Sequence, residues 1–243
     1  MAKQLLIYET AVPVSSERHR NLSVVAGEDY GFARDVNAVP VAAAEIPIVA
    51  LEMPIVFAGK DVKLPVAIMG LQPRKNDFVD ADGRWRGAYV PAFLRRYPFA
   101  LAAAEEGSKL TLCLDMTFGG VNTEGRGEAL FDADGGRTPY LDRMLTLCEG
   151  FEKEHRQLRT VSEMIAEMGL LEEMHAEVKL KQPVSLQGFH SVNRKKVSEL
   201  DDASLLRLMK TGGAELMHLH LASIRQFKRL GDMLSEGALA TAH

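Results

Sequence analysis

The hydrophobic pattern of this chain changes character near Thr138. Before that residue, apolar side chains come in short runs of strand length separated by turn residues, as in residues 54–57 and 64–71. After it, apolar side chains recur at helical spacing, first over residues 141–155 and again over 214–234. A strand-rich half followed by a helix-rich half predicts an α+β fold, with a mixed or antiparallel sheet packed against helices.

The first 120 residues are predicted to be mainly strand and turn. Polar residues 59–61 lie between two apolar runs and predict a hairpin, and the Asp82-Gly83 pair predicts a second tight turn because glycine takes a positive φ without strain. Residues 39–53 are ambiguous, since three alanines favour helix while Pro47 suits only a first turn or a kink. The strands that we expect in this half are 4–10, 22–26, 54–57, 64–71, 99–104 and 110–116, with a short helical turn at 92–97.

The second part of the chain is predicted to start with a long loop and then to be mainly helical. Six glycines over residues 118–137 indicate a loop of the length that is often functional. Thr138-Pro139 is a typical helix start, and Gly212-Gly213 a typical helix end. The expected elements are helices at 138–155, 161–171, 193–200, 203–210 and 214–234 and a strand at 184–192.

Composition excludes several classes of protein. The 243 residues include 47% hydrophobic and 26% charged side chains, which is typical of a folded globular chain. A net charge of −4 argues against a general nucleic-acid binder. No segment has the pattern of a signal peptide or of a membrane span, and the only cysteines, Cys113 and Cys148, lie in apolar patterns that suit a reducing compartment. We therefore expect a cytoplasmic protein.

Neither a metal site nor a cofactor site is expected. Asp80-Ala-Asp82-Gly83 and Asp132-Ala-Asp134-Gly135 lack the further oxygen ligands of a calcium loop, so both are interpreted as turns. The sequence has no phosphate-binding loop, no dinucleotide fingerprint and no local motif for a serine or cysteine nucleophile. His218 and His220 are two residues apart on a predicted helix and point to different faces, so we expect one to be buried and the other exposed to solvent.

The candidate ligand-binding residues are two carboxylates and an arginine-rich aromatic segment. Glu45 and Glu52 lie in the most apolar part of the chain, where a buried carboxylate needs a partner. Guanidinium groups suit a carboxylate or phosphate, and flat aromatic rings suit a peptide, a ring or a base. The alternative is structural: Arg95 and Arg96 must diverge, so one of them could bridge Glu45 or Glu52 inside the fold while the other faces solvent. The candidates are Trp85, Tyr89, Arg95, Arg96, Tyr97, Glu45 and Glu52.

The segment 82–101, DGRWRGAYVPAFLRRYPFAL, resembles the signature segment of the SapC family, and the segments 54–57, 130–135, 186–189 and 220–223 follow in the order of that family. The resemblance covers roughly residues 5–235 and implies a single SapC-like domain over 1–243, with a β-rich part at 1–120 and a helix-rich part at 138–235. It also implies a bacterial context of surface layers and outer-membrane proteins. It provides no catalytic residues.

Two functions are compatible with these features. The first is a cytoplasmic accessory or binding protein of a cell-surface or outer-membrane protein system, whose ligand is a peptide, a protein or a small molecule. The second is an enzyme that modifies amino acids or peptides at a site assembled from dispersed Arg, Glu and His residues. Neither function involves nucleic acid or a membrane span, and the C-terminal helix could form a homodimer contact. Whether any reaction is catalysed stays open at this stage.

Overall fold

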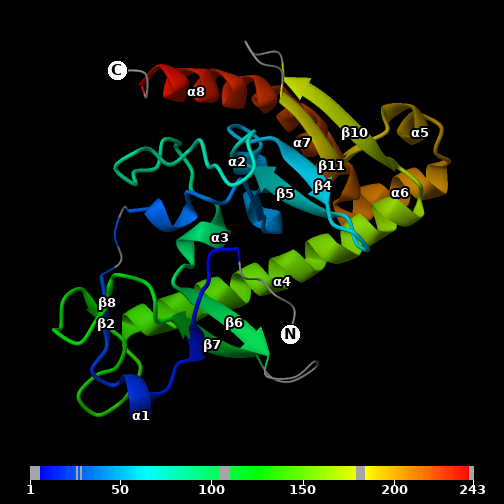
Figure 1. The fold of residues 1–243 in the computed structure, drawn as a ribbon. Helices are drawn as coiled ribbons and strands as arrows, with labels where there is room; N and C mark the ends of the chain where they lie inside the picture. Colours follow the sequence, from blue (N-terminus) through cyan, green and yellow to red (C-terminus); the bar gives the residue numbers. More distant parts are fainter. Residues whose placement is uncertain (1–5, 26, 28, 104–109, 179–183, 241–243) are drawn as a thin grey trace. The chain divides into compact units, whose positions relative to one another are not determined.

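The computed structural model describes residues 6–25, 27, 29–103, 110–178 and 184–240, and it confirms an α+β fold (Figure 1). The chain forms two compact units. The first unit comprises Met1–Asp29 and Ala92–Lys153, and the second comprises Tyr30–Pro91 and Glu154–His243. The description of residues 1–243 as one domain stays a prediction.

The first unit contains an antiparallel sheet in the order β1 (Ala11–Pro13), β7 (Leu110–Asp115), β6 (Phe99–Ala103). The prediction of a strand at 4–10 was wrong for its described part, since the strand begins only at Ala11. The backbone N–H groups of Glu9 and Thr10 donate to the side chain of Asp115, at 2.8 and 3.0 Å, instead of to a neighbouring strand. The Asp115 carboxylate therefore binds the N–H groups that would otherwise extend β1 toward the N-terminus.

A second small sheet in the first unit has β2 (Ser23–Val24) between β8 (Val121–Asn122) and β9 (Glu128–Ala129). The loop predicted at 118–137 thus contains two short strands that the sequence did not indicate. Their partner β2 lies about 100 residues earlier in the chain, so no local sequence pattern indicates the pairing. The core of this unit consists of buried residues from the strands and from the first part of helix α4, among them Phe99, Leu114, Leu130, Leu141 and Cys148.

Three turns share one hydrogen-bonding pattern. In each, an oxygen of the side chain of Asp80, Asn122 or Asp132 accepts the backbone N–H groups two and four residues further on, at 2.7–3.1 Å. A glycine with positive φ occupies the third position after the Asp or Asn, as the chain reversal requires. These glycines are Gly83, Gly125 and Gly135. The turn interpretation of both Asp-Ala-Asp-Gly segments is confirmed.

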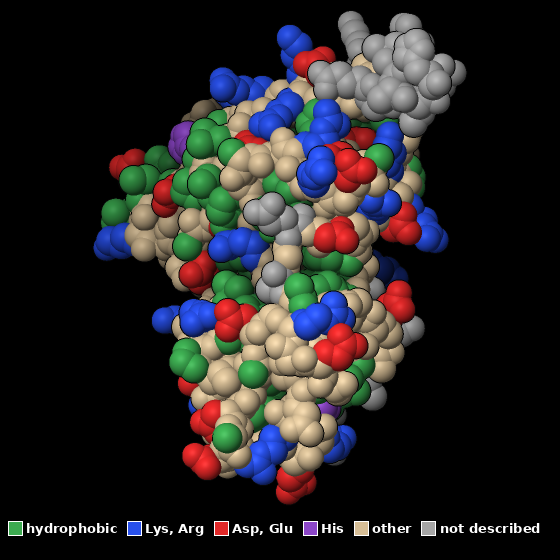
Figure 2. Space-filling view, turned by 90° about the vertical axis from the view of Figure 1, so that its left-hand side faces the viewer, with side chains coloured by type: hydrophobic (Ala, Val, Ile, Leu, Met, Phe, Trp, Pro, Cys, Tyr) green, Lys and Arg blue, Asp and Glu red, His purple; other side chains and the backbone are tan. Residues whose placement is uncertain are grey.

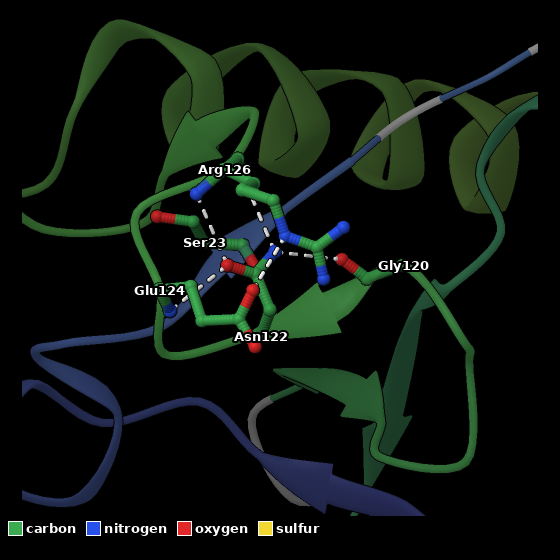
Figure 3. A network of polar contacts seen from close by, with 5 residues as sticks. All are labelled: Ser23, Gly120, Asn122, Glu124 and Arg126. Carbon is green, nitrogen blue, oxygen red and sulfur yellow. Dashed lines mark hydrogen bonds and ion pairs between the residues drawn. The ribbon is translucent and has the colours of Figure 1, made fainter.

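The Asn122 turn is shown in Figure 3. The side-chain nitrogen of Asn122 donates to the carbonyls of Ser23, Gly120 and Arg126, at 3.3, 3.1 and 3.0 Å, while its oxygen accepts from the amides of Glu124 and Arg126. One amide side chain thus joins strand β2 to the loop between β8 and β9. An aspartate here could satisfy only the accepting half of the network.

Helix α4 (Pro139–Glu167) is one continuous helix of 29 residues where the sequence predicted two. Its start is as expected, because Thr138 Oγ1 accepts the backbone N–H of Leu141 at 3.3 Å. Its end is earlier than predicted: Gly169 takes a φ of 68°, and strand β10 (Leu171–Val178) begins where we expected helix. The boundary between the two units falls within this helix.

The second unit contains a five-stranded antiparallel sheet. Its order is β10, β11 (Val184–Val192), β4 (Ile55–Ala58), β5 (Leu64–Ile68) and β3 (Ala38–Pro40). The predicted β4–β5 hairpin is confirmed, with Ala58 opposite Leu64. The predicted strand at 184–192 is also confirmed, whereas its partner β10 was missed. The ambiguous segment 39–53 ends β3 and then forms η2 (Ala43–Glu45) and α2 (Ile46–Val49), with Pro47 in the first turn.

The remaining helices are shorter than α4, and the predicted helix end at Gly212 is confirmed. Asn193 caps α5 (Arg194–Ser198), Asp201 caps α6 (Asp202–Thr211), and Gly212 ends α6 in the left-handed conformation. The predicted helix 214–234 is in fact three elements: α7 (Gly213–Ser223), η3 (Ile224–Gln226) and α8 (Phe227–Ala240). The other elements are α1 (Ser16–His19), η1 (Gly31–Ala33) and α3 (Ala92–Arg95).

Candidate functional site

Trp85 lies at the centre of an aromatic group in the second unit. A single bridge pairs Trp85 with Val79 across the Asp80 turn. The indole stacks on the buried ring of Phe78, with ring centroids 5.2 Å apart and an angle of 21° between planes, and its other neighbour is Tyr30 at 5.7 Å. Tyr30 in turn contacts Phe32 at 6.0 Å. Trp85, Tyr30 and Phe32 are all half-buried, so each ring keeps part of its surface in solvent.

The buried side chain of Glu52 holds the loop that follows Trp85. Glu52 is buried, with 8% of its surface exposed. Both carboxylate oxygens accept the backbone N–H of Ala88 at 3.0 Å, and one of them lies 3.4 Å from the guanidinium of Arg229. The same guanidinium lies 5.4 Å from the ring of Phe78. The predicted need of the buried Glu52 carboxylate for a partner is therefore met within the second unit, by partly exposed Arg229.

Glu45 holds the next residue of that loop. It is 4% exposed, and its carboxylate accepts from the backbone N–H of Ala42 at 2.7 Å and from the hydroxyl of Tyr89 at 3.0 Å. The carbonyl of Tyr89 accepts the indole N–H of Trp85 at 2.9 Å. Two buried carboxylates, seven residues apart in sequence, thus fix the loop that carries Trp85 and Tyr89.

Gly87 is required where this loop passes over Glu52. A Cβ at this position would lie 2.7 Å from Glu52 Oε2, 2.8 Å from Trp85 Nε1 and 3.1 Å from a ring carbon of Phe78. Contacts this short do not occur, so any larger residue would displace the loop, the carboxylate or the indole. The loop is therefore packed tightly against its supports.

Three arginines lie next to these aromatic residues in the chain. Arg34, Arg84 and Arg86 are all exposed. Arg34 donates to the carbonyl of Ala81 at 2.6 Å, and Arg84 lies 3.4 Å from Asp82 in a pair that is largely in solvent. We call the surface formed by six residues the aromatic–arginine surface: Tyr30, Phe32, Arg34, Arg84, Trp85 and Arg86.

Arg96 occupies the interior of the first unit. It is 0% exposed, and its guanidinium lies 4.5 Å from the ring centroid of Phe93 and 4.4 Å from that of Phe151. Arg96 pairs with Glu152 at 3.0 Å. A guanidinium placed between two rings and paired with a carboxylate is a strong structural contact, since cation–π and ionic attraction act together.

The other two candidates from the sequence also lie in the first unit. Arg95 is exposed, which confirms that the adjacent arginines diverge. Tyr97 is half-buried, 5.4 Å from Tyr8 and 5.3 Å from Phe118, and burial together with nearby Asp115 raises the pKa of its hydroxyl to about 12. The seven predicted residues thus divide, with Glu45, Glu52, Trp85 and Tyr89 in the second unit and Arg95, Arg96 and Tyr97 in the first.

His220 lies in the core of the second unit, and His218 is exposed, as predicted. Val192 N–H donates to His220 Nε2 at 3.1 Å, so Nε2 carries the lone pair and Nδ1–H donates to the Ile55 carbonyl at 2.7 Å. Ser191 Oγ lies 3.0 Å from the same Nε2. Burial lowers the pKa of His220 to about 4, against the opposing effect of the Ile55 bond.

The Ser191–His220 pair has the separation of a nucleophile and its base, with the Ile55 carbonyl orienting the ring. Its surroundings are those of a structural contact. The imidazole is 0% exposed, and its one lone pair is shared with a backbone N–H of β11. His220 therefore connects α7 with β4 and β11.

The described part of the chain contains no group of three His, Cys, Asp or Glu side chains placed to hold a metal ion. Within the same residues, no helix is long and apolar enough to cross a membrane. On the face drawn in Figure 2, Lys and Arg side chains lie among Asp and Glu side chains and form no broad field of one sign. Mixed charges of this kind suit local contacts with a partner better than they suit binding to a polyanion.

Sequence reasoning missed four residues of the site: Tyr30, Phe32, Arg34 and Arg229. Tyr30-Gly-Phe32 is an aromatic pair around a glycine in a segment without hydrophobic periodicity. That pattern could have marked an exposed aromatic contact. Arg229 follows a helical pattern that gives no sign of its partner, because Glu52 is distant in sequence.

Comparison with known proteins identifies the family of this chain. The family model described as SapC matches residues 14–230, which is most of the sequence and includes every residue of the aromatic–arginine surface. No curated protein and no solved structure matches the chain. The protein belongs to the SapC family.

Proposed function

We propose that this protein is a cytoplasmic, non-catalytic accessory protein of a bacterial cell-surface or outer-membrane protein system, and that the aromatic–arginine surface binds an extended acidic segment of its partner. The observation that carries the proposal is the support beneath Trp85. Two buried carboxylates, Glu45 and Glu52, hold a surface loop that carries half-buried Trp85 and exposed Arg86.

A surface fixed in this way is suited to recognition. A loop that is already ordered loses little conformational entropy when a partner binds. Half-exposed aromatic rings provide contact area with few rotatable bonds, and exposed guanidinium groups can pair with carboxylates of the partner.

The intrinsic fluorescence of Trp85 provides a direct test, because it is the only tryptophan of the chain. We expect a synthetic acidic, aromatic-containing peptide to change Trp85 emission in a saturable way, and a basic peptide of equal length to leave it unchanged. Arg84→Glu, which reverses an exposed charge, should weaken binding by about tenfold or more. Arg156→Glu on the exposed side of α4 is the matched control and should bind as the wild type does.

The cellular role needs a separate measurement. Affinity enrichment from a bacterial lysate should recover cell-surface or outer-membrane proteins with wild type and Arg156→Glu but not with Arg84→Glu. Equal recovery with all three proteins would refute the assignment of this surface. Recovery of cytoplasmic proteins alone would refute the proposed cellular context while leaving the peptide-binding result intact.

The second candidate is an enzyme acting on amino acids or peptides, and the Ser191–His220 distance of 3.0 Å is the observation that favours it. A fluorophosphonate probe reacts with activated serines. Labelling that disappears in Ser191→Ala would support the enzyme. If the serine only stabilises β11 and α7, no labelling is expected.

A further inference from the structure

A surface hollow of about 370 Å³ lies between the end of β11, α5 and α7 in the second unit. Most of the side chains lining it are apolar: Val192, Val197, Met217, Leu221 and Ala222. Val192 and Met217 are buried, so the floor is formed by the core, while Ala222 at the rim is exposed. The volume is within the range of small-molecule sites.

One cation at this hollow has no counter-charge. Three basic residues follow one another at the start of α5. Lys195 pairs with Glu199 at 3.9 Å, and Lys196 donates to the carbonyl of Gly169 at 2.9 Å. Arg194 lines the hollow, and its side chain has no hydrogen-bonding or ionic partner among the residues that the structure describes.

His218 adds a second polar group to the same hollow. Its Nδ1 donates to the carbonyl of Ala214 one helical turn earlier, at 2.7 Å, which fixes the ring. Its Nε2 has no hydrogen-bonding partner among the described residues. Arg194 from α5 and His218 from α7 are thus the two polar side chains, besides Ser198, that line an otherwise apolar hollow.

We propose that the hollow between α5 and α7 binds a small aliphatic carboxylate. The ligand carboxylate pairs with the Arg194 guanidinium, while its hydrocarbon chain packs against Val197, Met217 and Leu221. A single guanidinium matches a monoanion, and the apolar lining matches a chain rather than a second charged group. This site shares no residue with the aromatic–arginine surface, so it is independent of the proposed function.

Isothermal titration with sodium decanoate below its aggregation concentration tests the proposal. Decan-1-ol and decyltrimethylammonium have the same chain with no charge or the opposite charge. We expect the wild type to bind decanoate more tightly than either of them. Arg194→Gln should weaken decanoate binding by about tenfold and leave decan-1-ol binding unchanged, because only the ionic contact is lost. Ala222→Trp should block both by filling the hollow.

Two matched variants complete the experiment. Lys195→Gln removes a neighbouring charge that pairs with Glu199, and Ala203→Trp places an indole on exposed α6, away from the hollow. Both should bind decanoate as the wild type does. Decanoate binding that is absent, equal in Arg194→Gln and wild type, or unaffected by Ala222→Trp would overturn the site. Circular dichroism of each variant identifies any loss of fold, and a misfolded Ala222→Trp would be replaced by Ala222→Phe.

Discussion

Both carboxylate oxygens of Glu52 lie 3.0 Å from the backbone nitrogen of Ala88. A buried anion therefore stabilises an exposed turn of the chain, and the charge is balanced by Arg229. Because charge-assisted hydrogen bonds are about twice as strong as neutral ones, this contact fixes the position of the Trp85 loop. The candidate surface depends on that support as much as on its own side chains.

Gly87→Ala should destabilise the protein by about 1–3 kcal/mol, since the new Cβ would meet Glu52 and Trp85 at under 3 Å. Gly150→Ala is the matched control: nothing lies within 4 Å of a Cβ there, and alanine favours the interior of α4 by about 0.5–1 kcal/mol. The free energy of unfolding in urea measures both. Equal effects of the two substitutions would contradict the close packing of the loop.

Arg96→Ala should lower the free energy of unfolding by about 3 kcal/mol, because it leaves Glu152 without its cation and removes the contact with Phe93 and Phe151. Arg96→Lys should restore only part of the loss, since an ammonium cannot stack as a planar guanidinium does. The helical signal in far-ultraviolet circular dichroism, followed in urea, measures the free energy of unfolding. The exposed Arg156→Ala is expected to change stability little, and a comparable loss there would refute the special role of Arg96.

His220 should make the protein less stable in mild acid. Its pKa is about 4 in the folded state and 6.5 ordinarily, so unfolding takes up a proton between these values. The free energy of unfolding should therefore fall as pH drops from 6.5 to 4, by about 3 kcal/mol from this residue, and no further below that range.

Burial also lowers the pKa values of His19 and His190, so these residues contribute to the pH dependence of the wild type. A comparison of variants isolates the contribution of His220. Urea unfolding at a series of pH values should show a shallower slope for His220→Gln than for wild type. Gln157→Ala, which changes an exposed side chain without a titrating group, should keep the wild-type slope. A slope that is the same in all three proteins would show that His220 takes up its proton in the folded state.

Asn122→Asp and Asp132→Asn are opposite exchanges in equivalent turns, and they should have unequal effects. Asn122 Nδ2 donates to three carbonyls, so a carboxylate there would face acceptors and cost about 1–3 kcal/mol. Asp132 uses its oxygen to accept from two backbone N–H groups, and an asparagine oxygen can do the same. Thermal unfolding followed by circular dichroism compares the two, and a larger loss in Asp132→Asn would contradict this assignment of donors.

Local physical chemistry made part of the fold predictable. The β4–β5 hairpin, the helix start at Thr138, the helix end at Gly212 and the Asp-Gly turns all depend on residues within a few positions of one another. For the same reason the divergence of Arg95 from Arg96 and of His218 from His220 could be foreseen. Family membership also came from the sequence, since it rests on the order of short segments along the chain.

The tertiary structure determined which buried groups and which strands pair with each other. The sequence could show that Glu45, Glu52 and one of the two adjacent arginines need partners, because a buried charge without one is costly. It could not show that the arginine is Arg96, or that the partners would be Tyr89, Ala88 and Glu152. It also missed β10 and the β2 sheet, whose pairing partners are brought together only by folding. The sequence by itself determined which groups must be satisfied and where the chain turns. Only the packed structure determined which distant groups satisfy them, because that depends on contacts between segments that no local pattern encodes.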